Sequence, residues 1–142
     1  MIIALLILKN ATGLVAPAWG KWLSGILLLV FLAVALRTNW AGLTGEGIVL
    51  PLVSAGYVLF DPILLAVTVL TASGFAGGSA VGRAWWYVLG GILLYYIANQ
   101  AYTYLVFIKE YATGSPIDMG WLLGFGLIAL AAVMTRNLLE GG

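Results

Sequence analysis

Asp61 is the residue of this sequence that most clearly indicates a site, because it lies in the middle of a long apolar run, GYVLFDPILLAV. An ionised carboxylate in apolar surroundings is unfavourable unless something compensates its charge. Pro62 follows it directly, and a proline inside a helix removes a backbone donor and kinks or breaks the helix. We therefore expect a second half-helix that Asp61 caps, whose free amides stabilise the carboxylate or a bound anion. The structural alternative is that Asp61 only caps this half-helix or is protonated against a neighbouring tyrosine.

A second apolar segment carries polar side chains that could complete a site with Asp61. At helical spacing, one face of this segment combines three phenols, an amide and a hydroxyl: Tyr95, Tyr96, Asn99, Tyr102 and Thr103. Tyr57 lies one turn before Asp61 on its own segment. We expect a partly polar pocket between helices, lined by Tyr57, Asp61, Asn99, Tyr102 and Asp118. The alternative is that these amides and hydroxyls only join helices to one another.

Several classes of chemistry are excluded by residue types that the sequence lacks. It contains no histidine and no cysteine, so disulfides, thiolate metal sites and a Ser-His-Asp constellation are excluded. We expect no enzymatic activity, no metal site, and no covalently attached or His-ligated haem. No cofactor is predicted, although a bound lipid or pigment is compatible with this composition. The six basic and five acidic residues are scattered singly, which argues against nucleic-acid binding.

Composition indicates the elements that must position these residues. The 142 residues are 63% hydrophobic and 8% charged, and their mean hydropathy is +1.11. Soluble domains carry roughly 25% charged residues, so the chain is predicted to be an all-α integral membrane protein. At about 20 apolar residues per crossing, its length fits a bundle of about four transmembrane helices.

Four apolar stretches are long enough to serve as these spans. They are expected at residues 22–36, 48–72 (broken near Asp61–Pro62), 84–108 and 118–135. Ser115 and Pro116 form a helix-start signal before the last one. Residues 1–19 are predicted to form an interfacial or re-entrant segment, because Lys9 ends an apolar run too short to cross; an extra short span is the alternative. Residues 1–142 are thus treated as one membrane domain.

The basic residues predict how the chain is oriented. With four crossings, one side of the membrane receives Lys21, Arg83 and Arg136, and the other receives Arg37 and Lys109. The positive-inside rule then places both termini in the cytoplasm of a multi-pass protein of the cell (inner) membrane. An extra N-terminal span would move the N-terminus outside.

Glycines mark where helices are expected to approach one another closely. Gly120 and Gly124 form a GxxxG pair in the last span, and Gly90 and Gly91 are adjacent in the span before it. Such spacing lets two backbones meet. We favour packing within the chain over dimerisation.

Part of the chain resembles a known family. The matching features are Tyr57-(x)3-Asp61, Arg83, Asn99-x-x-Tyr102, and Tyr111-(x)2-Gly114-Ser115-Pro116-x-Asp118-(x)2-Trp121-(x)2-Gly124. From Leu50 to about Leu139, the sequence is similar to the last spans of the multi-spanning membrane sensory domains that precede diguanylate cyclase, phosphodiesterase and histidine kinase domains in bacteria. The resemblance implies a receiver of a signal and adds Trp121 to the candidate ligand-binding residues. Asn99 stands where the family usually has Asp, which makes proton transfer between two acids less credible.

Three functions fit these observations, in descending order of preference. The first is a non-enzymatic sensory or regulatory module that acts through a partner protein, because no output domain fits in the six residues after Arg136. The second is a structural or accessory subunit of a larger membrane complex. The third is a small oligomeric proton-coupled transporter with its site at Asp61–Pro62. All three predict contacts with membrane lipids and either a homo-oligomer or a larger complex.

Overall fold

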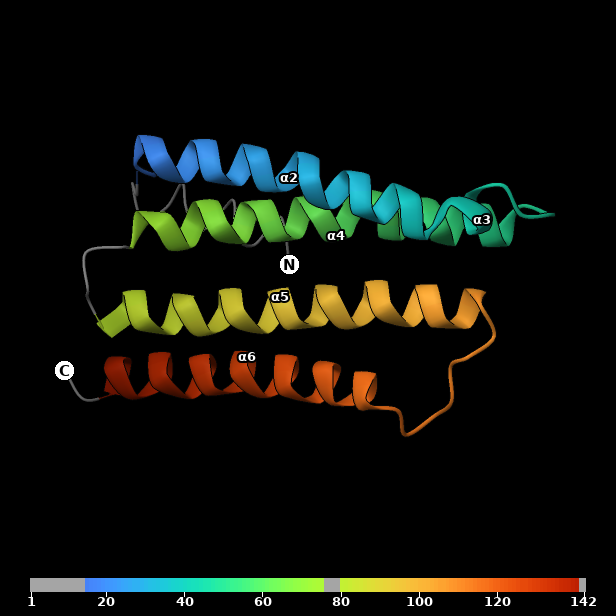
Figure 1. The fold of residues 1–142 in the computed structure, drawn as a ribbon. Coiled ribbons are helices and arrows are strands. Elements are labelled where there is room, and N and C mark those ends of the chain that lie inside the picture. The colour runs from blue at the N-terminus through green and yellow to red at the C-terminus, as the bar shows by residue number, and fades with distance from the viewer. Residues whose placement is uncertain (1–14, 76–79, 141–142) are drawn as a thin grey trace.

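The computed structural model describes residues 15–75 and 80–140, and within these ranges every element is a helix. The elements are α2 (Ala18–Thr38), α3 (Trp40–Leu43), α4 (Val49–Gly74), α5 (Ala80–Phe107) and α6 (Pro116–Glu140). The four long helices alternate in direction along the bundle, with α3 as a single turn between α2 and α4 (Figure 1). Most of the expected N-terminal segment falls in residues 1–14, outside the described residues.

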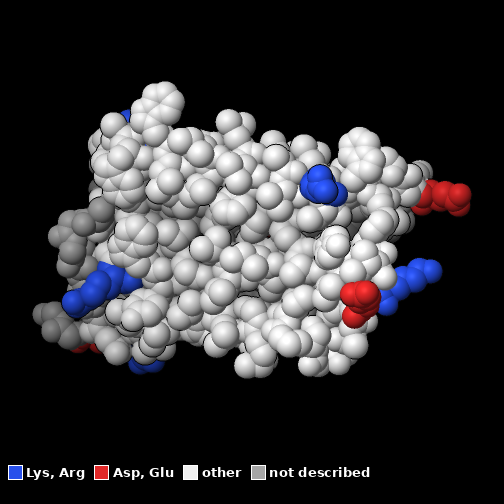
Figure 2. Space-filling model, viewed as in Figure 1, with Lys and Arg blue, Asp and Glu red and all other residues white. Residues whose placement is uncertain are grey.

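Three of the described helices are long and apolar enough to cross a membrane: α2, α4 and the Pro116–Leu138 part of α6. The charged side chains visible on one face of the molecule lie toward the two ends of the bundle, and the surface between them is uncharged (Figure 2). An uncharged band between charged ends is the distribution that a bilayer requires. The all-helical membrane class predicted from composition is therefore supported, with three candidate spans among the described residues.

The helices pack as two antiparallel pairs joined through their middle members. The most extensive contacts are between α5 and α6, followed by those between α2 and α4, and α4 then meets α5 (Figure 1). The buried centre of the bundle is formed by Leu65, Ile92 and Tyr96. This arrangement brings the polar faces of α4 and α5 together and leaves the outer faces of α2 and α6 exposed.

The helices extend further than the apolar stretches that predicted them. α2 begins at Ala18, α5 begins at Ala80 and so includes Arg83, and α6 continues to Glu140. Near the end of α6, Arg136 Nε donates to Glu140 Oε1 at 2.7 Å. Backbone hydrogen bonding continues beyond the apolar part of each helix into polar surroundings, so a prediction from hydropathy alone makes the helices too short.

α4 is continuous through Pro62, so the break expected at Asp61–Pro62 is not formed. The Pro62 side chain is among the most completely buried in the described residues. A continuous helix loses the one hydrogen bond that Pro62 cannot donate, whereas a break would leave several backbone groups unpaired in apolar surroundings. The half-helix N-terminus expected to stabilise the Asp61 carboxylate is therefore absent from α4.

Two glycines let α5 and α6 meet backbone to backbone. A Cβ atom added to Gly91 would lie 2.5 Å from the Gly124 carbonyl oxygen, and one added to Gly124 would lie 2.8 Å from the Gly91 carbonyl oxygen. At Gly120, an added Cβ would lie 2.8 Å from Ala98 Cβ. Gly90 makes only an ordinary contact with Leu127. Gly91, Gly120 and Gly124 thus lie at a close interface within the chain.

Candidate functional site

Asp61 of α4 and Asn99 of α5 form the central polar contact between these two helices. Asn99 Nδ2 donates to Asp61 Oδ2 at 2.6 Å. Asn99 is buried and Asp61 is half-buried. Among the described residues, the only ion pair is Arg136 with Glu140, so no cation of this part of the chain neutralises Asp61.

The residues on either side of this contact turn toward α2 instead. The Thr38 hydroxyl donates to the Gln100 side-chain carbonyl oxygen. The Tyr96 hydroxyl donates to the Phe31 carbonyl oxygen at 2.7 Å, and the two rings meet edge to face. The polar face of α5 is therefore shared between two partner helices, and Tyr96 is not available to a ligand.

A cavity of about 480 Å³ lies beside α4 and α5, near the turn that links α2 to α3; we call it the polar cavity. Tyr57 and Tyr102, both predicted as ligand-binding residues, line it. Its other polar side chains are Thr38, Asn39, Ser54, Thr103 and Lys109. Lys109 is the one charged residue among the described residues that line this cavity. Hydroxyls, phenols and an ammonium group around an apolar floor are suited to an amphipathic organic ligand.

Lys109 has a backbone conformation that is unusual for a residue other than glycine. Its φ angle is 60°, in the left-handed region. The Glu110 amide donates to the Leu105 carbonyl oxygen at 2.9 Å and the Lys109 amide to the Val106 carbonyl oxygen at 3.1 Å. These two bonds form a Schellman cap, in which glycine is the usual residue at this position. The cap places Lys109 just beyond α5, where it lines the polar cavity.

Tyr102 lies between the polar cavity and the loop that joins α5 to α6. Its ring lies edge to face with Tyr111, at a centroid distance of 4.7 Å, and with Trp121, at 5.3 Å. The Tyr111 hydroxyl donates to Asp118 Oδ1 at 2.9 Å, and the Gly114 amide donates to Asp118 Oδ2 at 2.6 Å. We call Tyr111, Gly114 and Asp118 the loop clasp. It holds the connection against the first turn of α6.

The loop clasp changes the acidity of Tyr111. The hydrogen bond to the Asp118 carboxylate raises the pKa of the Tyr111 phenol above its ordinary value, because it favours the protonated form.

Ser115 supports the first turn of α6, since its Oγ accepts a hydrogen bond from the Ile117 amide at 3.3 Å. α6 begins at Pro116, as Ser115 and Pro116 predicted.

Asp61 lines a second, smaller cavity of about 220 Å³ between α4, α5 and α6; we call it the Asp61 cavity. Its other lining residues are Leu64, Ile92, Tyr95, Phe125 and Ile128. The rings of Tyr95 and Phe125 lie 5.7 Å apart. Phe125 was not predicted from the sequence, because one more aromatic residue in an apolar helix carries no signal of its own.

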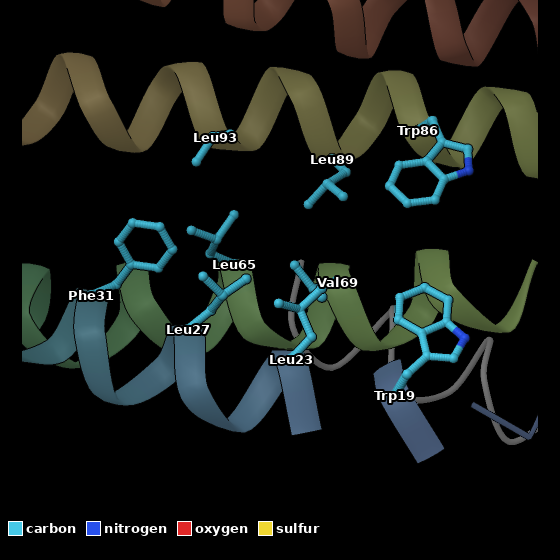
Figure 3. A pocket seen from close by; sticks show the side chains of 9 residues that line it. All are labelled: Trp19, Leu23, Leu27, Phe31, Leu65, Val69, Trp86, Leu89 and Leu93. Carbon is cyan, nitrogen blue, oxygen red and sulfur yellow. The ribbon is translucent and has the colours of Figure 1, made fainter. Parts of the chain in front are cut away.

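A third cavity, of about 170 Å³, is entirely apolar and lies between α2, α4 and α5 (Figure 3). Trp19 and Trp86 face each other across one end of it, and leucines, Val69 and Phe31 line the rest (Figure 3). This cavity was not predicted from the sequence, because its lining residues are the same types that contact lipid.

The six predicted ligand-binding residues do not surround one pocket. Asp61 and Asn99 are hydrogen-bonded to each other at the Asp61 cavity, and Tyr57 and Tyr102 line the polar cavity. Trp121 packs on Tyr102, and Asp118 belongs to the loop clasp. Tyr102 thus joins the polar cavity to Trp121 and, through Tyr111, to Asp118.

No protein-family model, curated protein or solved structure matches this chain.

Proposed function

We propose that this protein is a non-enzymatic, membrane-embedded sensory or regulatory module that binds a ligand in the polar cavity and acts through a partner protein. The observation that carries this proposal is the double role of Tyr102, which lines the cavity and also packs on Tyr111 and Trp121. A volume of about 480 Å³ lies within the usual range for small-molecule sites. The sequence pattern from Leu50 to about Leu139, which resembles the membrane sensory domains of bacterial signalling proteins, favours the same role.

Signal transmission follows from this position of Tyr102. A ligand that changes where the Tyr102 ring lies alters its contact with Tyr111, and therefore the loop clasp at Asp118. The ligand shifts the clasp only to the extent that it binds one arrangement better than the other. The clasp lies at the end of the bundle, where a partner protein can contact it.

The proposal includes four crossings of the cell membrane, with the C-terminus in the cytoplasm. α5 is the additional span. Its 28 residues extend roughly 42 Å at 1.5 Å each, which exceeds the roughly 30 Å of hydrocarbon. Tyr96 and Asn99 donate to partners within the bundle, and the Gln100 side-chain carbonyl oxygen accepts from Thr38, so these groups do not require water.

The test is to identify what remains bound to the purified chain in a mild detergent, by native mass spectrometry. Thr103→Trp fills the polar cavity, and Tyr104→Trp makes the same kind of change at an exposed neighbouring position outside it. We expect the wild type and Tyr104→Trp to retain one small molecule that Thr103→Trp loses. Retention by Thr103→Trp, or no retained molecule in the wild type, contradicts the proposal.

The same experiment separates this function from the accessory-subunit alternative. A stoichiometric larger protein that co-purifies with the wild type and Thr103→Trp alike, without a small molecule, favours the function of an accessory subunit.

To test whether the cavity is coupled to the loop clasp, amide hydrogen exchange of residues 109–115 is compared with and without the retained molecule. We expect exchange in this segment to change when the cavity is emptied.

A further inference from the structure

We infer that the Asp61 cavity is a binding site for a small alkylammonium ion. This site is separate from the polar cavity and does not depend on the function proposed for it. It combines a carboxylate, two aromatic rings and aliphatic side chains from three helices, α4, α5 and α6.

The charge of Asp61 is the first reason. The neutral Asn99 amide donates to Asp61 Oδ2 at 2.6 Å, and Asp61 forms no ion pair among the described residues. A single neutral donor compensates only part of a full negative charge in surroundings of low polarity. A cation in the cavity would supply the rest.

The aromatic rings are the second reason, and they indicate the type of cation. Tyr95 and Phe125 line the same cavity, with their ring planes at 55° and their centroids 5.7 Å apart. The faces of aromatic rings attract organic ammonium ions, particularly where water is excluded. Phe125 is 58% exposed, so one wall of the cavity lies at the outer face of α6 and is open to a ligand.

Other ligand classes fit this cavity less well. Asp61 disfavours an anion. A small hard metal ion prefers several oxygen ligands, and no group of three metal-ligating side chains occurs among the described residues. An uncharged apolar molecule gains nothing from the carboxylate, and the cavity at Trp19 and Trp86 already offers it an apolar site.

The size of the cavity limits the ligand. A cavity of about 150 Å³ holds benzene, so one of about 220 Å³ fits an ammonium ion of about nine or ten non-hydrogen atoms. Tetraethylammonium has this size and carries a permanent charge, which makes it a suitable probe.

The experiment is a titration of the full chain with tetraethylammonium chloride by isothermal calorimetry, in detergent micelles at constant ionic strength. We expect saturable binding of one ion per chain. Asp61→Asn keeps the shape of the side chain but removes its charge, and should weaken binding at least tenfold. Glu46→Gln removes a carboxylate in an exposed loop and should bind as the wild type does.

A second pair of variants keeps the inference testable if Asp61→Asn does not fold. Phe125→Ala removes one ring from the cavity wall at an exposed position, and should weaken binding about threefold to tenfold. Leu122→Ala is the matched control, because Leu122 is exposed on the same helix and does not line the cavity. The inference is overturned if the wild type shows no saturable binding, or if Asp61→Asn or Phe125→Ala binds as tightly as its control.

Discussion

Neighbouring residues on α5 serve different partners, and this determines which of them can meet a ligand. Asn99 donates to Asp61 on α4, whereas Gln100, the next residue, contacts Thr38 at the end of α2. Successive residues of a helix point about 100° apart, so two adjacent amides can join two different helices. Tyr102 is left to line the polar cavity, although its sequence spacing groups it with Asn99.

The Tyr111 phenol provides a prediction at the same scale. Its folded-state pKa is raised by the hydrogen bond to Asp118, so the stabilisation from this bond is fully present below the ordinary tyrosine pKa of about 10. It is lost as the pH rises through the higher folded-state value. We expect the absorbance titration of phenolate, taken as wild type minus Tyr111→Phe, to have its midpoint above that of an unperturbed tyrosine.

Two variants check the cause of this shift. Asp118→Asn removes the carboxylate and should return the Tyr111 midpoint toward its ordinary value. Tyr104→Phe removes an exposed tyrosine, whereas it is Tyr111 that donates to Asp118, so this change should leave the Tyr111 midpoint unchanged. A Tyr111 midpoint at or below the ordinary value in the wild type would mean that the loop clasp is not formed.

At the scale of the elements, the α5–α6 pair depends on the absence of side chains at its contact. Gly124→Leu places a side chain against the Gly91 carbonyl oxygen, which is backbone and can move only with its helix. We expect the free energy of unfolding to fall by about 1 to 3 kcal/mol. The measurement is the unfolding of the detergent-solubilised chain by increasing fractions of sodium dodecyl sulfate, followed by helical circular dichroism.

Gly126 offers the matched control for this prediction. It lies in the same helix two residues away, and an added Cβ would meet nothing within 4 Å. Gly126→Leu should therefore unfold at the wild-type detergent fraction or above it, because leucine favours helix more than glycine does. Equal destabilisation by both substitutions would show that the loss of glycine itself, and not the close contact, is responsible.

At the scale of the whole molecule, the number of crossings determines which loops share a side of the membrane. The chain contains no cysteine, so single cysteines can be introduced one at a time. With four crossings, Gly47→Cys and Thr113→Cys should react with a membrane-impermeant maleimide on intact cells, whereas Lys21→Cys and Glu140→Cys should react only after permeabilisation. If α5 did not cross, the cysteines at 47 and 113 would lie on opposite sides.

The sequence by itself determined the helical class of the protein and the residues that share a helical face. Composition predicts apolar helices that can cross a membrane, because so few charged residues cannot cover a soluble domain, and every described element is a helix. The start of α6 at Pro116 also followed from local chemistry, since Ser115 and Pro116 satisfy the requirements of a first helical turn. Helical periodicity alone predicts that Tyr57 lies near Asp61 on one face of its helix, and that Asn99 lies near Tyr102 on one face of the next.

Only the tertiary structure decided how these faces meet. Helical period shows which residues lie on one face but not which neighbour that face contacts, and apolar residues face lipid and helix alike in a membrane. Asn99 therefore binds Asp61, which lines one cavity, whereas Tyr102 lines another, and the apolar cavity at Trp19 had no signal in the sequence. Continuity of α4 through Pro62 is also a tertiary result, because unpaired backbone groups are less tolerable inside an apolar bundle than in water.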